Sequence, residues 1–358
     1  MVTVVLMLVM LVLVSLYTAK IQSFEHRILL NSQNQLLAKA AAEAAIQRGF
    51  AELQQNRLWQ GNRLEEDVAG QFRFEVSASQ QTLRRGTSAL VLFELQAKGQ
   101  SADGLASAQI HVQALRYPLL ATLPAAPLML EGSLHYQTRV ELVANPNGAG
   151  DGVPLSLWSN RPVDFSVINA VTCGLHEFQQ GQCSSQAYSN SSQRGADVLD
   201  NDSQFPDDIF AHLFNLPREH YAVLRNEAQL IVADCQGLDN QFSGVVWVQG
   251  DCQLNADIHY GSQSAPLLLL VNQGDVSLAD NTHLYGLLVL LKPQNDVSDY
   301  GINMGANSAV YGALAANQTV GRQASMLRVV YVAEVLRAIQ QLPQFSRILK
   351  VPGSWRDY

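Results

Sequence analysis

The first 19 residues of this 358-residue chain carry no charged side chain, and this run restricts the fold more than any other feature. As a helix it would be about 28 Å long, close to the roughly 30 Å hydrocarbon core of a bilayer. The chain has no proline before Pro118 and no glycine before Gly49, and apolar residues recur at helical spacing. We therefore expect one helix from about Thr3 to about Gln55. Such a helix cannot bury its apolar stripe within one domain, so we expect partner helices to cover it.

The charges around this run bear on topology. No Lys or Arg precedes it, whereas Lys20 and Arg27 follow it, and positive charges normally stay cytoplasmic. The simplest explanation for a body outside the cytoplasm is a short basic leader upstream of Met1. A cleaved signal peptide is the alternative, but its apolar core would be shorter, and Ala19-Lys20-Ile21 is a poor cleavage site.

Four cysteines indicate the compartment: Cys173, Cys183, Cys235 and Cys252. None forms a CxxC pair, and an even count suits two disulfides in an oxidising environment. Three pairings are open. We favour Cys173 with Cys183 and Cys235 with Cys252, because each pair closes a short local loop. Four free core thiols are the alternative.

The body of the chain has the pattern of a β-rich protein. Phe72, Phe74 and Val76 alternate with polar neighbours, and residues 71–116 are predicted to form a three-stranded meander. Pro118 marks a boundary, and a Ser/Asn/Gln-rich loop is expected over 179–193.

Residues 241–325 are weakly repetitive. Gly-Asp pairs at Asp251 and Asp275 each follow a short apolar strand, and Tyr-Gly pairs recur at Tyr285 and Tyr311. A period in the twenties favours a β-solenoid, whose coils stack on one another. An ordinary antiparallel sheet is the alternative. A helix over 325–341 is expected to cap the stack, with Trp355 packed on the last coil.

Several segments together carry a resemblance to a known family. The apolar start, Glu25-His26-Arg27, Ala41-Ala42-Glu43-Ala44-Ala45, the Gly/Asn-rich stretch over 145–159, the Gly-Asp coils and the ending over 351–358 resemble PilX-type minor pilins. The resemblance implies a leader removed by prepilin peptidase and a helix that packs beside the helices of other pilins. It assigns helix assembly to Val5, Glu25, Arg27 and Glu43. Val5 stands where major pilins typically carry glutamate. PilX-like subunits and the related end-capping subunits often lack that glutamate.

Motifs for chemistry are weak. The chain has no Gly-x-Ser-x-Gly, and His176-Glu177 lacks the second histidine of a zinc protease. Asp200, Asp202, Asp207 and Asp208 do not match EF-hand spacing. Asp251 and Asp275 would stack one coil apart, as in glycan-cleaving solenoids, but Gly-Asp turns explain them better. A net charge of −8 argues against a nucleic-acid partner. We expect no enzyme activity, no cofactor and no metal site.

These observations predict an α+β protein with a long N-terminal membrane or pilin helix, a pilin-like antiparallel sheet and a β-rich domain that contains a short β-solenoid. The predicted segments are the helix over 1–55 and the meander over 56–118. A Gly/Asn/Pro-rich region with a disulfide loop follows over 119–240, then the repeats over 241–325 and a capping helix with its tail over 326–358. The predicted function is a minor pilin in priming or tip-proximal assembly. Its partners would be other minor pilins, the major pilin, a tip adhesin and the inner membrane before assembly. The body would enter the periplasm and then the extracellular pilus. A membrane-tethered adhesin or scaffold outside a pilus is the alternative.

Overall fold

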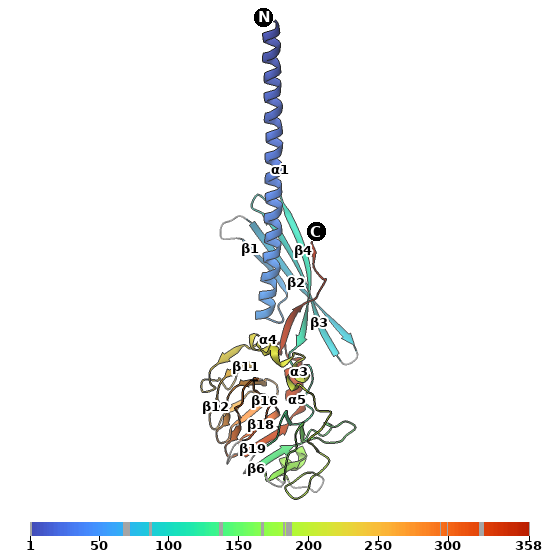
Figure 1. Cartoon of the computed structure of the whole chain (residues 1–358), viewed down its shortest axis with the longest axis vertical. Helices are drawn as coiled ribbons and strands as arrows, with labels where there is room; N and C mark the ends of the chain where they lie inside the picture. Colours follow the sequence, from blue (N-terminus) through green and yellow to red (C-terminus); the bar gives the residue numbers. More distant parts are fainter. Residues whose placement is uncertain are drawn as a thin grey trace. The chain divides into compact units, whose positions relative to one another are not determined.

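In a computed structural model, the protein forms two compact units. The structure describes residues 2–66, 72–85, 88–135, 139–165, 168–181, 183, 188–293, 295–298, 300–321 and 326–357. The first unit comprises Met1–Tyr117 with Arg347–Tyr358, and the second comprises Pro118–Ser346. A long helix followed by β-rich units is the predicted α+β class (Figure 1). The return of the C-terminal residues to the first unit was not predicted.

The first unit combines one helix with one antiparallel sheet. Helix α1 (Val2–Gln55) is exposed over residues 2–33, and its second half lies against the sheet (Figure 1). The strands are β1 (Gly61–Glu66), β2 (Phe72–Arg85), β3 (Ser88–Ser101), β4 (Ser107–Pro118), β20 (Ser346–Lys350) and β21 (Arg356–Asp357). They run in the order β1-β2-β3-β4-β20, with β21 also on β4. The meander prediction is confirmed over β2–β4. The strand β1 and the two C-terminal strands were missed.

Small residues bring α1 against the sheet. Ala38, Ala41, Ala42 and Ala45 are all fully buried, at the three- and four-residue spacings that align one helix face. Strand β3 meets this face at Gly99, where an added Cβ would lie 2.1 Å from the Ala38 carbonyl oxygen and 2.4 Å from the Ala42 nitrogen. The helix backbone therefore rests almost directly on the strand backbone. The sheet, rather than partner helices, covers this half of α1.

The second unit is built from strands that stack in parallel. Its widest face runs through β10 (Leu230–Val232), β11 (Gly244–Gln249), β14 (Leu267–Asn272), β16 (His283–Leu291) and β18 (Ala309–Ala316). Val246 pairs with Leu269, Leu269 with Leu288 and Leu288 with Leu314. A second face stacks β12 (Cys252–Leu254), β15 (Val276–Leu278) and β17 (Ile302–Met304), while β13 (His259–Tyr260) pairs with β16. Successive repeats therefore stack as coils in this segment, in place of the antiparallel alternative.

The stack is longer than the predicted repeats. Leu314 of β18 pairs with Leu128, Leu128 with Leu157 and Leu157 with Val198. The strands concerned are β5 (Leu128–Leu130), β6 (Arg139–Val143), β7 (Leu157–Ser159), β8 (Ala170–Cys173), β9 (Val198–Leu199) and β19 (Met326–Tyr331). The last coil of the chain thus lies beside its first coil. The predicted boundary at residue 240 therefore divides strands that belong to one stack.

Short helices cover the outer side of the widest face. They are α3 (Ile209–Phe214), η1 (Arg218–His220), α4 (Tyr221–Asn226), α5 (Ala333–Gln341) and η2 (Pro343–Phe345). Leu336 and Ile339 of α5 pack with Leu287 and Ala313, so α5 covers a side of the stack and not its end. The predicted helix is also too long, because residues 326–331 form strand β19.

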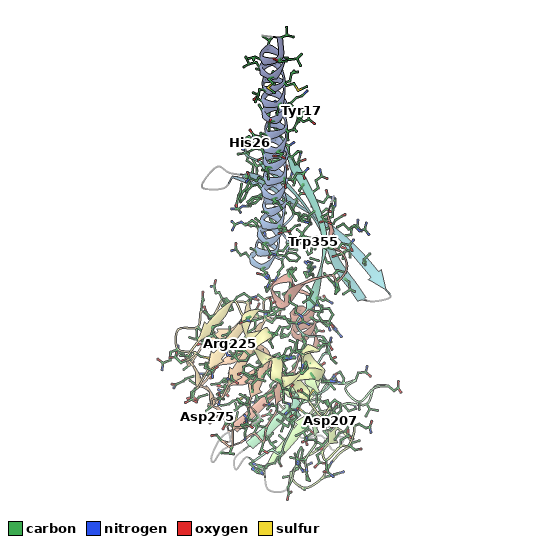
Figure 2. All side chains as sticks on the ribbon, turned by 45° about the horizontal axis from the view of Figure 1, so that its top comes forward. Tyr17, His26, Asp207, Arg225, Asp275 and Trp355 are labelled. Atoms are coloured by element: carbon green, nitrogen blue, oxygen red, sulfur yellow. A yellow bond between two sulfur atoms is a disulfide. The ribbon has the colours of Figure 1, made fainter. Side chains whose placement is uncertain are left out.

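Trp355 does not pack on the last coil, as the sequence had suggested. It packs against the core of the first unit, where the Lys350 ammonium lies 4.3 Å from the centre of its ring (Figure 2). Strands β20 and β21 carry the tail along β4, so the tail belongs to the antiparallel sheet.

Candidate functional site

The exposed half of α1 is the feature of the chain that most needs a partner. Its large apolar side chains face solvent throughout, as the 56% exposure of Val5 and the 60% exposure of Leu13 illustrate. Burying such a side chain gains about 1.5–3 kcal/mol, so this surface is stable only in a bilayer or among other helices. The helix is long and apolar enough to cross a membrane, and none of its apolar window is buried within the protein.

The four predicted assembly residues are spread along α1 and do not form a cluster. Val5, Glu25, Arg27 and Glu43 are all exposed. Because an α-helix turns by about 100° per residue, Glu25 and Glu43 lie on one side of it and Arg27 on nearly the opposite side, close to the side of Val5. They would therefore meet different neighbours if α1 entered a helical assembly. Their role in assembly stays a prediction.

The packed half of α1 is joined to the rest of its unit by polar contacts that the sequence did not indicate. The Lys39 ammonium donates to the Asp357 carboxylate of β21 at 3.0 Å. This hydrogen bond, and then the charge of the partner, raise the pKa of Lys39 and lower that of Asp357. Asn34 donates to Asp103 at 2.7 Å. The pKa of Asp103 is lowered mainly by the hydrogen bond from the Ser101 hydroxyl.

A second set of ion pairs lies at the end of α1. Glu52 accepts from Arg63 of β1 at 2.6 Å and also lies 3.3 Å from Arg48. Glu65 receives both arginines as well, Arg63 at 2.7 Å and Arg48 at 3.3 Å. These contacts join the last turns of the helix to the edge strand β1.

The four cysteines form the two disulfides that the sequence analysis favoured. Cys173 of β8 is joined to Cys183, with Cα atoms 5.1 Å apart, and the closed loop contains α2 (Leu175–Gln179). Cys235 is joined to Cys252 of β12, with Cα atoms 4.8 Å apart. Each bridge contributes roughly 2–4 kcal/mol by restricting the unfolded chain. Of the predicted loop over 179–193, residues 182 and 184–187 lie outside the described residues.

The stacked carboxylates of the coils have structural partners. Asp251 accepts from the Asp275 backbone N–H at 2.8 Å, and Asp275 accepts from the Gly301 N–H at 2.8 Å (Asp275 is labelled in Figure 2). Asp280 does the same for the Ala306 N–H at 2.7 Å. Each carboxylate thus joins its own turn to the turn of the next coil. The expected role in local Gly-Asp turns is therefore replaced by a structural role between coils.

Three of the four aspartates considered for calcium have structural partners. Asp200 pairs with Arg194, Asp202 accepts from the Trp158 indole at 2.7 Å, and Asp208 caps α3 by accepting from Phe210 at 2.9 Å. Over the described ranges of the chain, no group of three or more His, Cys, Asp or Glu residues is placed to hold a metal ion.

Comparison with known proteins yields little. No family model matches the sequence, and no curated protein matches it significantly. The crystal structure of the competence-associated pilin ComZ from Thermus thermophilus is similar, with a TM-score of 0.25 and 13% identity, over 91% of this chain and 98% of that one. A TM-score this low does not establish a common fold, so nothing about this chain is drawn from it.

Proposed function

We propose that this chain is a non-enzymatic minor subunit of a type IV pilus, acting in pilus priming or near the tip. The observation that carries the proposal is the division of α1 into an exposed apolar half and a half packed on an antiparallel sheet. A bilayer would hold the first half before assembly, and neighbouring helices would replace the lipid afterwards. One continuous helix would then serve both as membrane anchor and as filament contact.

Val5 is the reason for proposing a role at the leading end. An ionised side chain inside the hydrocarbon core is costly, by roughly 2.5–3.5 kcal/mol on insertion scales when it lies at the centre. A glutamate at position 5 is useful to a pilin that must engage the subunit ahead of it, and a subunit with nothing ahead does not need one. Few copies per pilus are therefore expected.

The proposed location follows from the same helix and from the cysteines. Two disulfides require an oxidising compartment, so the body would be periplasmic while α1 stays in the inner membrane. The protein would then join an extracellular pilus. Its partners would be other minor pilins, the major pilin and a tip adhesin.

Photocrosslinking tests the proposal in living cells. A photoreactive residue placed at Val5 should crosslink to other pilins, whereas one at Val297, exposed on the second unit, should not. Quantitative mass spectrometry of sheared pili should then find few copies relative to the major pilin. A copy number near that of the major pilin would contradict the tip-proximal role. Retention of the whole population in membranes after shearing, without crosslinks from Val5, would instead support a membrane-tethered adhesin or scaffold.

A further inference from the structure

One part of the outer face of the stack is left uncovered by the short helices. Side chains at alternate positions of a strand share a face, so Tyr285 and Leu287 of β16 point to the same side. Leu287 is buried beneath the helices, as is Ala313 of β18. Tyr285 and Tyr311, two residues earlier on these strands, are only half-buried. The covered apolar surface therefore ends at a pair of tyrosines.

The two tyrosines form a ladder across neighbouring coils. They are register partners, with ring centres 4.9 Å apart and planes 13° apart. His259 and His283 stack beside them at 4.5 Å, and His283 meets the edge of Tyr311 at 5.2 Å. The stacking covers one face of each tyrosine ring, and Tyr311 also packs with Phe178. Neither hydroxyl forms a hydrogen bond to any residue that the structure describes.

These tyrosines line a groove with a volume of about 340 Å³. That volume falls within the range of roughly 300–1,000 Å³ for small-molecule sites. Phe178 and Gln179 line the groove from α2, and Gln263 and Glu334 contribute polar groups. Helix α2 lies within the loop closed by Cys173–Cys183, and Phe178 packs with that disulfide and Tyr311. This side of the groove is therefore covalently anchored.

The electrostatic character of the groove narrows the chemistry of its ligand. No lysine or arginine is among its lining residues in the described part of the chain. Glu334 is its one charged group, is itself exposed, and lies 3.6 Å from Arg337. Burial raises the pKa of Tyr311, so its hydroxyl remains a neutral donor and acceptor. Arg337 is paired with Glu334, so the groove lining offers a ligand mainly neutral polar groups and apolar surface.

We propose that this groove binds a neutral saccharide unit of a glycan. A sugar ring presents hydroxyl groups that both donate and accept, as do the two tyrosine hydroxyls and the amides of Gln179 and Gln263. Its C–H surface suits the apolar wall that contains Phe178. The inference concerns the second unit alone, so its failure would leave the proposed role in a pilus unchanged.

Calorimetric titration of the full chain, held in a detergent without sugar groups such as lauryldimethylamine oxide, tests this binding. The probes are maltohexaose, cellohexaose, chitohexaose and mannohexaose, with hexagalacturonate and a Phe-containing tripeptide as contrasts. At least one neutral sugar should saturate the wild-type protein. The double variant Tyr285→Phe/Tyr311→Phe removes both hydroxyls, and with them two hydrogen bonds to the sugar, and should weaken that binding about tenfold.

Two further variants keep the test independent of folding. Gln263→Ala changes a groove amide and should also weaken binding, whereas Tyr221→Phe removes a tyrosine hydroxyl outside the groove and should not. Near-ultraviolet circular dichroism verifies that each variant is folded. The proposal is overturned if no neutral sugar saturates the wild type, if only hexagalacturonate or the tripeptide binds, or if the folded groove variants bind like Tyr221→Phe.

Discussion

The two halves of α1 differ in the size of their side chains and in what those side chains contact. The exposed half carries large apolar residues that contact nothing within the protein. The packed half carries a row of alanines that lets the helix backbone approach Gly99 of β3. Large apolar side chains gain the most free energy when lipid or another helix buries them, whereas small side chains let two backbones approach closely within the fold. The difference indicates which half of the helix is built for the unit itself and which for its surroundings.

The largest expected effect breaks the close approach. Gly99→Val places side-chain atoms where the Ala38 carbonyl and the Ala42 nitrogen already lie, so α1 must move off the sheet. Overpacking of this kind costs about 1–3 kcal/mol and more when backbone blocks the new atoms, so we expect a loss above about 3 kcal/mol. Chemical denaturation in micelles measures it. Leu13→Ala, in the exposed half, is the control and should leave the unfolding free energy of the first unit unchanged. Equal stability of the two variants would disprove the distinction.

A charge in the exposed half tests the other side of the comparison. Leu11→Lys should oppose membrane integration by roughly 2.5–3.5 kcal/mol, because the ammonium would lie near the centre of the span. The same change at Leu36, which is exposed beyond the apolar run, should have little effect. Alkaline extraction of membranes, followed by quantification of the retained protein, compares them. Full retention of both variants would mean that the span does not set membrane attachment.

A smaller loss is expected where the C-terminal tail supports the packed half. Trp355→Ala removes an indole that packs on the first unit and lies under Lys350. Because the indole is only half-buried, we expect about 1–2 kcal/mol, from partial apolar burial and the cation–π contact. Tyr17→Ala, on the exposed half of α1, should cost the unit nothing (Figure 2 labels both residues). Limited proteolysis measures the effect, and Trp355→Ala should be cut faster than Tyr17→Ala. A faster cut in Tyr17→Ala would contradict the expectation.

Local pattern was enough to predict α1 and the strands β2–β4, because periodicity and the absence of proline act within a few residues. It could not predict that Leu314 pairs with Leu128, since those residues are remote in the chain and neither local sequence indicates which strand it pairs with. The destination of Trp355 was missed for the same reason. The row Ala38, Ala41, Ala42 and Ala45 was visible in the sequence. Its meaning required a facing glycine, and the sequence does not show that Gly99 of β3 faces this row.

The candidate site divides in the same way. The apolar run that exposes Val5 was apparent from composition, and the favoured cysteine pairing followed from short loops. The tyrosine ladder could have been suspected from the recurrence of Tyr285 and Tyr311 one repeat apart. That they form the floor of a groove depends on α2 and its disulfide, which approach from a coil formed much earlier in the chain.

The smallest expected effect concerns the ion pair between Lys39 and Asp357, which lies at the surface where solvent screens it. The hydrogen bond from Lys39 lowers the pKa of Asp357 in the folded protein, so its contribution is present above the unfolded pKa and is lost as the pH falls through the folded value. The pKa of Lys39 is raised, so its contribution is present below the unfolded pKa and is lost as the pH rises through the folded value.

The pair should therefore stabilise the tail evenly through the neutral range and weaken only at the two extremes. Titration of Asp357 by NMR should show its pKa rise in Lys39→Met, although a backbone hydrogen bond keeps part of the depression. Glu43→Gln is the matched control, because Glu43 acts on Lys39 through charge alone and as its weakest influence. Added salt should reduce the Lys39 effect, as screening requires. An Asp357 pKa that is identical in wild type and Lys39→Met would show that the ion pair does not help to hold β21. Strand pairing would then hold β21, and this polar contact of the packed half would be a consequence of close packing and not a source of stability.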